Sequence, residues 1–127
     1  MISTCKNCSK EFKHNPSQGG TYCSVKCQRD KEQQVYVEQW LNGDISGIIR
    51  GNYVSGYIRR YLLEEAGHKC SECGWDKINT TTGKSPLEID HIDGNRKNSN
   101  YNNLRVLCPN CHALKPTYKA LNRKKQV

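Results

Sequence analysis

The sequence predicts a small α+β protein that is stabilised by zinc. Its 127 residues are only 35% hydrophobic and include a single Phe, so a core of apolar side chains alone would be marginal. Eight cysteines form four close pairs, which supply the missing support. Two segments before the third cysteine pair have helical character, and two short apolar runs lie between the third and fourth pairs.

The cysteines are expected to bind zinc rather than to form disulfides. The first residues contain no apolar stretch of a secretory signal, and no apolar stretch approaches the length of a membrane span. We therefore expect a cytoplasmic, reducing environment, in which thiols remain free. Two pairs for each tetrahedral ion would give two structural Zn²⁺ sites. The expected ligand sets are Cys5, Cys8, Cys23 and Cys27 for the first ion, and Cys70, Cys73, Cys108 and Cys111 for the second.

Residues 1–34 are expected to form an N-terminal zinc ribbon or knuckle with four cysteine ligands. The segment 1–27 is polar, has no helical period and contains too few apolar residues to fold without metal. His14 lies between the two cysteine pairs and is an alternative ligand, although four cysteines already fill a tetrahedral site.

Residues 35–66 are expected to be a helical region that links the two zinc units. A first helix is predicted over 28–41, where Asn42-Gly43 is a stop signal, and a second over about 53–66, where Gly67 ends it. The second helix has one apolar stripe, for which packing in the core is the simplest explanation. Its members are Val54, Tyr57, Ile58, Tyr61 and Leu62.

Residues 67–118 contain the residues that suggest chemistry. The pairs at 70/73 and 108/111 would make a closed, fully thiolate site with a structural role only. Between them, 87–92 is predicted to be a strand that runs into a turn at Asp93-Gly94, and 102–107 a second strand. Pro109 suits the first turn of a helix that carries His112. Asp90 and His91 would face opposite sides of a regular strand, so a local bend is expected to bring both to one site.

These motifs, in this order, resemble the HNH (ββα-metal) endonuclease family. They are Cys-x-x-Cys, Asp-His-Ile, Asn-Leu and Cys-x-x-Cys-His, and the resemblance covers residues 60–118. It implies a two-stranded hairpin packed on a helix around one divalent ion. His91 would be the general base, and Asp90 and His112 the metal ligands. Asn103 would orient the catalytic loop, although the adjacent Asn102 remains an alternative. The implied product of DNA cleavage has a 5′-phosphate and a 3′-hydroxyl.

The chemistry of these side chains fits that role independently. Hydrolysis of a phosphodiester at neutral pH needs a base with a pKa near that of histidine. It also needs a Lewis acid to offset the charge on phosphorus and on the leaving oxygen. A mixed Asp/His site accepts several ions, so Mg²⁺ is expected in the cell and Mn²⁺, Ni²⁺ and Zn²⁺ are alternatives.

Two residues depart from the family's usual pattern. Asp90 stands where many members have His, which would make the ion site harder. Pro116 follows His112 by four residues, and a proline inside a helix breaks or kinks it. The helix that carries His112 is therefore expected to be short.

The charge distribution predicts contact with nucleic acid, and the family resemblance implies double-stranded DNA as the partner. The formal net charge is +8, and from residue 115 to the end there are five basic residues and no acidic one. Residues 119–127 are expected to be a basic tail. The candidate DNA contacts are Lys115, Lys119, Arg123, Lys124 and Lys125. One active site in each chain cuts one strand, and a monomer or a weak dimer is expected.

Each feature also has a simpler explanation. His91 could be an ordinary strand histidine, the Asp-His pair part of a turn, and the asparagines loop residues. A non-catalytic, zinc-dependent nucleic-acid binder is the main alternative function, and recruitment of a protein partner by the zinc unit is another. Among nucleases, the whole chain resembles the free-standing homing endonucleases of bacteriophages, which implies a phage-encoded protein in a bacterial host. Roles in phage packaging or DNA degradation are the alternatives.

Overall fold

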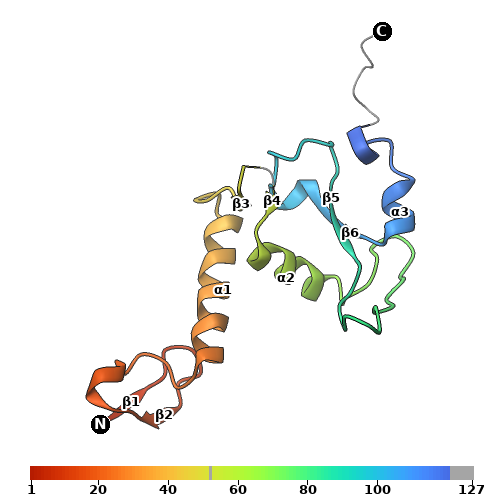
Figure 1. The fold of residues 1–127 in the computed structure, drawn as a ribbon. Coiled ribbons are helices and arrows are strands. Elements are labelled where there is room, and N and C mark those ends of the chain that lie inside the picture. Colours follow the sequence, from red (N-terminus) through yellow and green to blue (C-terminus); the bar gives the residue numbers. More distant parts are fainter. Residues whose placement is uncertain (52, 121–127) are drawn as a thin grey trace. The chain divides into compact units, whose positions relative to one another are not determined.

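The expected small α+β architecture is confirmed by a computed structural model, which describes residues 1–51 and 53–120. The chain divides into two compact units, of which the first is Met1–Gln39 and the second begins at Trp40 (Figure 1). Within the described residues, each sheet is a single antiparallel pair of strands. None of the helices in this part of the chain is long and apolar enough to cross a membrane.

The first unit contains a short hairpin and most of a long helix. Strand β1 (Ile2–Thr4) pairs with β2 (Glu11–Lys13), and a 3-10 turn, η1 (Pro16–Gln18), follows. Helix α1 (Val25–Leu41) begins three residues before the predicted start at 28. The cause is local, because Ser24 Oγ accepts a hydrogen bond from the backbone N–H of Cys27 at 3.1 Å, as an N-cap residue does.

The second unit opens with two very short strands and a helix. Strand β3 (Ile48–Ile49) pairs with β4 (Tyr53–Val54), so residues 53 and 54 are not helical, contrary to the sequence-based expectation. Helix α2 (Gly56–Glu65) starts instead after Ser55, whose Oγ accepts a hydrogen bond from the N–H of Ile58. Gly47 has a φ of +73°, and a Cβ there would lie 2.1 Å from Ile58 Cδ1, so the close packing at this point requires glycine.

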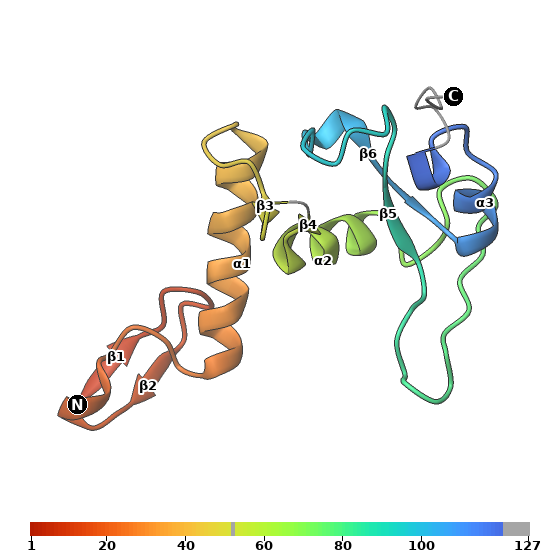
Figure 2. The ribbon, with the colours of Figure 1, turned by 45° about the horizontal axis from the view of Figure 1, so that its top comes forward.

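The centre of the second unit is an antiparallel ladder with a helix at its end (Figure 2). Strand β5 (Glu88–His91) pairs with β6 (Leu104–Leu107), which follows the 3-10 turn η2 (Tyr101–Asn103). Helix α3 (Pro109–Ala113) contacts both strands and is only five residues long, so it is short, as expected, and ends before Pro116. A last 3-10 turn, η3, covers Tyr118–Ala120. The apolar core of this unit consists mainly of Ile58, Leu62, Leu63, Leu87, Leu104, Val106 and Leu107.

A solvent-exposed loop connects the third cysteine pair to β5. Every residue from 76 to 84 is exposed. Asn79 closes the loop on itself: its N–H donates to Lys84 O at 3.0 Å, its carbonyl accepts from Gly83 N at 2.8 Å, and its Oδ1 accepts from Thr81 N at 2.9 Å. The loop therefore gets its shape from its own hydrogen bonds.

Candidate metal centres and active site

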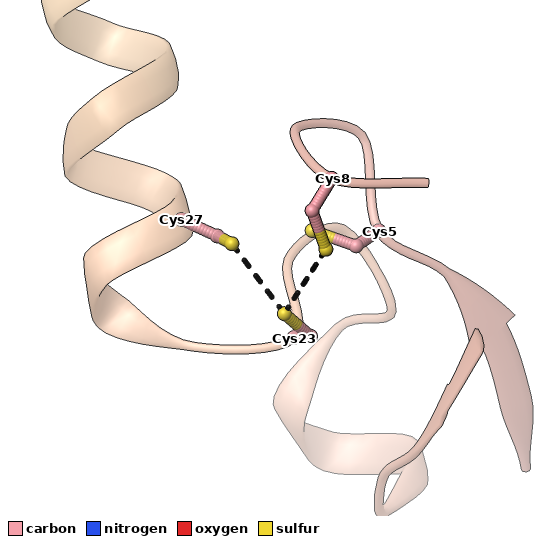
Figure 3. A group of neighbouring side chains, drawn as sticks. All are labelled: Cys5, Cys8, Cys23 and Cys27. Atoms are coloured by element: carbon pink, nitrogen blue, oxygen red, sulfur yellow. Dashed lines mark hydrogen bonds between the residues drawn. The ribbon is translucent and has the colours of Figure 1, made fainter. Parts of the chain in front are cut away.

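The four cysteines of the first unit meet at one point. Cys5 and Cys8 follow β1, Cys23 precedes α1, and Cys27 lies in the first turn of α1 (Figure 3). Their Sγ atoms all lie within 4.8 Å of one another. Two of the separations are 3.6 Å, between Cys8 and Cys23, and 3.5 Å, between Cys23 and Cys27. The hairpin and the helix thus each bring one predicted pair to a common tetrad.

The second tetrad joins the start of the HNH-like segment to its end. Cys70 and Cys73 precede the long loop, Cys108 is the N-cap of α3, and Cys111 lies within that helix. Their Sγ atoms also lie within 4.8 Å of one another, with 3.7 Å between Cys73 and Cys108. Ser71, which lies between Cys70 and Cys73, connects this segment to β6. Its backbone N–H and its Oγ both donate to Val106 O, at 2.9 and 2.8 Å.

Both tetrads fit a zinc ion. Four sulfurs at about 2.3 Å from a tetrahedral ion lie about 3.8 Å from one another, close to the separations found here. A disulfide would require about 2.05 Å, and all eight cysteines are free. Burial opposes ionisation of Cys70, but the backbone N–H groups around it, chiefly those of Cys73 and Cys108, lower the pKa of its thiol to about 6. Each cluster brings four thiol sulfurs together, so each could hold a metal ion.

The two predicted ligands of the catalytic ion face each other across the end of the ladder. His112 lies on α3, and its Nε2 is 3.3 Å from Oδ1 of Asp90 on β5. The Asp90 side chain is only 5% exposed. Two cis donors of an ion that binds oxygen and nitrogen at about 2.1 Å are about 3.0 Å apart, so this pair fits a divalent cation.

Each of these two ligands has a second partner. The other imidazole nitrogen of His112, Nδ1, contacts Oε2 of Glu88. The other carboxylate oxygen of Asp90, Oδ2, accepts a hydrogen bond from Arg105 Nε at 2.7 Å. Asp90 and Arg105 are directly opposite each other in the ladder.

His91 is the last residue of β5 and is held by a buried serine. Its Nε2 lies 3.1 Å from Ser99 Oγ, and the carbonyl of Ser99 accepts a hydrogen bond from Trp40 Nε1 at 2.7 Å. Burial lowers the pKa of His91 below its ordinary value, the Asp90 and Asp93 carboxylates oppose this shift, and Arg96 adds to it. A neutral imidazole at physiological pH is the result.

Asn103 fastens the loop that follows His91. Its Nδ2 donates to Asp93 Oδ1 at 2.9 Å and to Asn98 O at 2.7 Å, and its Oδ1 accepts from the N–H of Asp93 at 3.1 Å. The side-chain amide of Asn98, the N–H of Asn95 and the side-chain amide of Asn103 together lower the pKa of Asp93. Asn102, the alternative, is exposed.

Asp90, His91 and His112 line one cavity of 780 Å³. Asp90 and His91 both line it even though they are consecutive residues of β5, and both pair in register with β6. Three cationic side chains line it as well: Arg59, Arg96 and Lys119. Arg59 also donates to Leu87 O at 2.9 Å, just before β5. An open, cationic cavity lined by histidines and a carboxylate suits a phosphate group.

The residues expected to contact DNA differ in their surroundings, because one lines the cavity and another is already in an ion pair. Lys119 lines the cavity, and its Nζ lies 5.3 Å from the ring centre of Tyr118. Lys115 instead forms an ion pair with Glu72, and its side chain is 17% exposed. The remaining three candidates, Arg123, Lys124 and Lys125, lie outside the described residues. His14, the alternative zinc ligand, hydrogen-bonds Ser3 Oγ through Nε2 at 2.8 Å and is not part of the cysteine cluster.

Sequence reasoning missed three residues of the site. Glu88 could have been found, because residues two apart in a strand share a face and Asp90 was already a candidate. Arg105 requires the register of the hairpin, which depends on the turns between 92 and 103. Ser99 gave no signal in the sequence, because its role arises only when that segment folds back on His91.

Comparisons relate the chain to known proteins. Residues 70–117 match the family model described as HNH endonuclease. The chain is similar to "H-N-H endonuclease F-TflIV" of Escherichia phage T5, with 40% identity over 78 residues, which are 59% of this chain and 34% of that protein. It is also similar to "Zorya protein ZorE" of Escherichia coli, with 30% identity over 110 residues, which are 87% of this chain and 23% of that protein.

The chain thus spans about a third and about a quarter of the lengths of these two relatives. No solved structure matches it significantly. The family model begins at Cys70, the first ligand of the second tetrad, and ends just beyond α3, so it includes both strands of the ladder and all the candidate catalytic residues. Residues 70–117 of this protein thus match an HNH endonuclease domain, and the chain is similar to a phage H-N-H endonuclease.

Proposed function

We propose that this protein is a metal-dependent endonuclease that hydrolyses phosphodiester bonds of double-stranded DNA. One observation carries the proposal: Asp90 Oδ1 and His112 Nε2 lie 3.3 Å apart in a cavity that His91 also lines. A base and a pair of metal donors within one cationic cavity are the groups that phosphodiester hydrolysis needs. The match of residues 70–117 to HNH endonucleases supports the same interpretation.

Asp90 and His112 would hold the catalytic ion, for which Mg²⁺ is the expected species and Mn²⁺, Ni²⁺ and Zn²⁺ are alternatives. A bound divalent ion would supply Lewis-acid stabilisation of the charge that develops on the phosphate oxygens. The two cysteine tetrads would hold structural Zn²⁺, and since all four positions of each ion are then filled by protein, they would take no part in cleavage.

His91 would take the proton of the attacking water. We assign the Nε2–H as the donor to Ser99 Oγ, which leaves the lone pair on Nδ1 to accept that proton. Among the described residues, Nδ1 has no hydrogen-bond partner of its own, so it is available to water. Asn103 would hold the segment after His91 in place through its bonds to Asp93 and Asn98.

The cationic side chains of the cavity would bind the DNA backbone. Arg59, Arg96 and Lys119 can neutralise phosphates without reading the sequence of bases. The basic tail after residue 119 would extend this contact, and the N-terminal zinc unit with α1 would lengthen the footprint on DNA. The likeness to a phage endonuclease supports a phage-type enzyme, and we propose a homing endonuclease in a bacterial host, ahead of packaging or degradation.

The test is cleavage of a supercoiled plasmid by zinc-loaded wild-type protein and by His91→Ala. With Mg²⁺ or Mn²⁺ the wild type should convert the plasmid to nicked and then linear DNA. His91→Ala should lose this activity by a factor of about 100 or more, because general base catalysis contributes that much. Single cuts at a few positions would favour homing, and a smear would favour degradation.

Chelation by EDTA should also stop cleavage, and zinc content measured before and after EDTA separates loss of the catalytic ion from unfolding. DNA binding without cleavage in any ion would instead favour the non-catalytic zinc-dependent binder. Cleavage by His91→Ala at the wild-type rate would show that another group is the base.

A further inference from the structure

The two side chains proposed to bind the catalytic ion offer four donor atoms, and neighbouring residues occupy two of them. His112 uses Nδ1 to contact Glu88, and Asp90 uses Oδ2 to accept from Arg105. The two atoms that remain, His112 Nε2 and Asp90 Oδ1, are the pair that face each other at 3.3 Å.

We propose that Glu88 and Arg105 are positioning residues that select one donor atom on each metal ligand. The inference rests on the proposed function, because it concerns the ion at Asp90 and His112. It adds two residues to that site and assigns each a separate task. Glu88 fixes which nitrogen of His112 carries the proton, and Arg105 makes Asp90 a ligand through one oxygen only.

The arrangement follows from the strand and the helix. Glu88 and Asp90 are two residues apart in β5, so their side chains leave the same face of the strand. Helix α3 contacts β5 at this face and places the His112 ring between the two carboxylates. One imidazole therefore spans both acidic side chains, with one nitrogen directed to each.

The Glu88 contact determines the tautomer of His112. An ionised carboxylate can only accept hydrogen bonds, so a neutral His112 that bonds Glu88 must carry its proton on Nδ1. The lone pair is then on Nε2, which is the nitrogen near Asp90. Carboxylates that orient the histidine ligands of metal ions act in this way, and their loss costs about 10- to 100-fold in metal affinity.

The Arg105 contact limits Asp90 to one oxygen. Arg105 Nε donates to Oδ2 from the opposite strand, in register, and its side chain is 25% exposed while that of Asp90 is 5% exposed. Because Arg105 engages Oδ2, Oδ1 is the oxygen left to face His112 and the ion. Ca²⁺ often takes both oxygens of a carboxylate, whereas Mg²⁺ and Mn²⁺ sites use one, so this contact should disfavour Ca²⁺.

The Glu88 part is tested without measuring cleavage. Mn²⁺ affinity of zinc-loaded protein is measured by EPR, and the His112 tautomer by nitrogen NMR at pH 8 in the absence of Mn²⁺. Glu88→Ala should lose about 10- to 100-fold in Mn²⁺ affinity and shift His112 from the Nδ1–H form toward the Nε2–H form. Glu88→Gln should keep the Nδ1–H form, because its amide oxygen still accepts. Glu64→Ala, which removes an exposed carboxylate on α2 that pairs with Arg60, is the control and should change neither quantity.

The Arg105 part is tested by the ratio of Ca²⁺ to Mn²⁺ affinity. Arg105→Gln removes a cation, which affects both divalent ions equally, so a change in the ratio reports the loss of one-oxygen binding. The ratio should rise severalfold in Arg105→Gln and stay constant in Arg60→Gln. Zinc content and circular dichroism establish that each variant is folded.

The possible outcomes separate this inference from the proposed function. If wild-type protein has no Mn²⁺ site that His112→Ala removes, the ligand assignment itself is wrong. If that site exists but Glu88→Ala keeps its affinity and its tautomer, or Arg105→Gln keeps the ion ratio, then the positioning roles are overturned and the proposed function stands.

Discussion

Asn103 and Asp93 are joined by two hydrogen bonds, because Asn103 Nδ2 donates to the Asp93 carboxylate at 2.9 Å while Asn103 Oδ1 accepts from the Asp93 backbone N–H at 3.1 Å. The same Nδ2 also donates to Asn98 O, so one side chain closes the loop between the two strands of the ladder. This loop begins directly after His91, and its conformation therefore controls where the histidine lies.

Replacement of Asn103 by Ala should lower the cleavage rate by about 10- to 100-fold, because a small displacement of a catalytic group has an effect of that size. Metal affinity should change little, because Asp90 and His112 are held by other residues. Asn102→Ala is the matched control, since Asn102 is adjacent and exposed. Single-turnover cleavage of a plasmid measures both variants. A larger effect at Asn102 would reverse the assignment.

As the pH is lowered, the rate of cleavage should begin to fall only below about 6.5, the ordinary pKa of histidine. A base must be neutral, and burial lowers the pKa of His91, so the neutral form persists to lower pH. Arg96 contributes to this lowering, so Arg96→Gln should move the acid limb of the rate profile to higher pH. Single-turnover rates between pH 5 and 8 give the limb, and Arg60→Gln should leave it in place. An acid limb above pH 7 in the wild type would contradict the assignment.

The two cysteine tetrads should bind one Zn²⁺ each, and a substitution in one tetrad should remove only the ion of that tetrad. Cys73→Ser should reduce the zinc content from two ions to one for each chain and abolish cleavage, because its tetrad fastens α3 to the start of the HNH domain. Cys8→Ser should also lose one ion, but cleavage of plasmid at high protein concentration should survive, since the first tetrad lies in the other unit. Zinc release assays and circular dichroism measure these outcomes. Equal loss of cleavage in both variants would show that the units depend on each other.

Trp40→Phe should destabilise the second unit by breaking the hydrogen bond from the indole to Ser99 O, which has a length of 2.7 Å. Trp40 is 4% exposed, and its ring packs edge-on against Tyr61 and Tyr101. The buried carbonyl would lose its partner, which costs about 1–3 kcal/mol and lowers Tm by about 4–24 °C in a unit of this size. Trp75→Phe is the control, because Trp75 is more exposed. Thermal unfolding at saturating zinc compares the two, and equal shifts would argue against a special role for the Ser99 contact.

Lys119→Ala should weaken DNA binding more than Lys115→Ala. Lys119 is exposed and lines the cavity, whereas Lys115 already forms an ion pair with Glu72. Loss of one phosphate contact should lower the slope of log affinity against log salt by about one. Fluorescence anisotropy in the His91→Ala background, which is expected not to cleave, measures this slope. A larger change of this slope in Lys115→Ala than in Lys119→Ala would mean that Lys115 leaves Glu72 when DNA binds.

The pattern of cysteines, the helical stripe and the Asp-His and Cys-x-x-Cys-His motifs were sufficient to predict the small α+β fold and the HNH domain. The predicted start of α2 was wrong, because the apolar stripe includes Val54, which is part of the β3–β4 pair. The N-cap at Ser55 determines where the helix begins. The contacts of Glu88, Arg105 and Ser99 could not be predicted, since they depend on strand register and on the path of the loop after His91. Such contacts are long-range products of folding, which periodicity does not encode.

The loop of residues 76–84 has a practical consequence. Its shape comes from its own hydrogen bonds around Asn79, its side chains are exposed, and none of its residues lines the catalytic cavity. Segments of this kind accept additional sequence at a small entropic cost, which grows only slowly with length. A fluorescent label or an epitope tag introduced between Thr80 and Thr82 would therefore report the position of the protein in a cell or on a stretched DNA molecule without disturbing the two cysteine tetrads or the cavity.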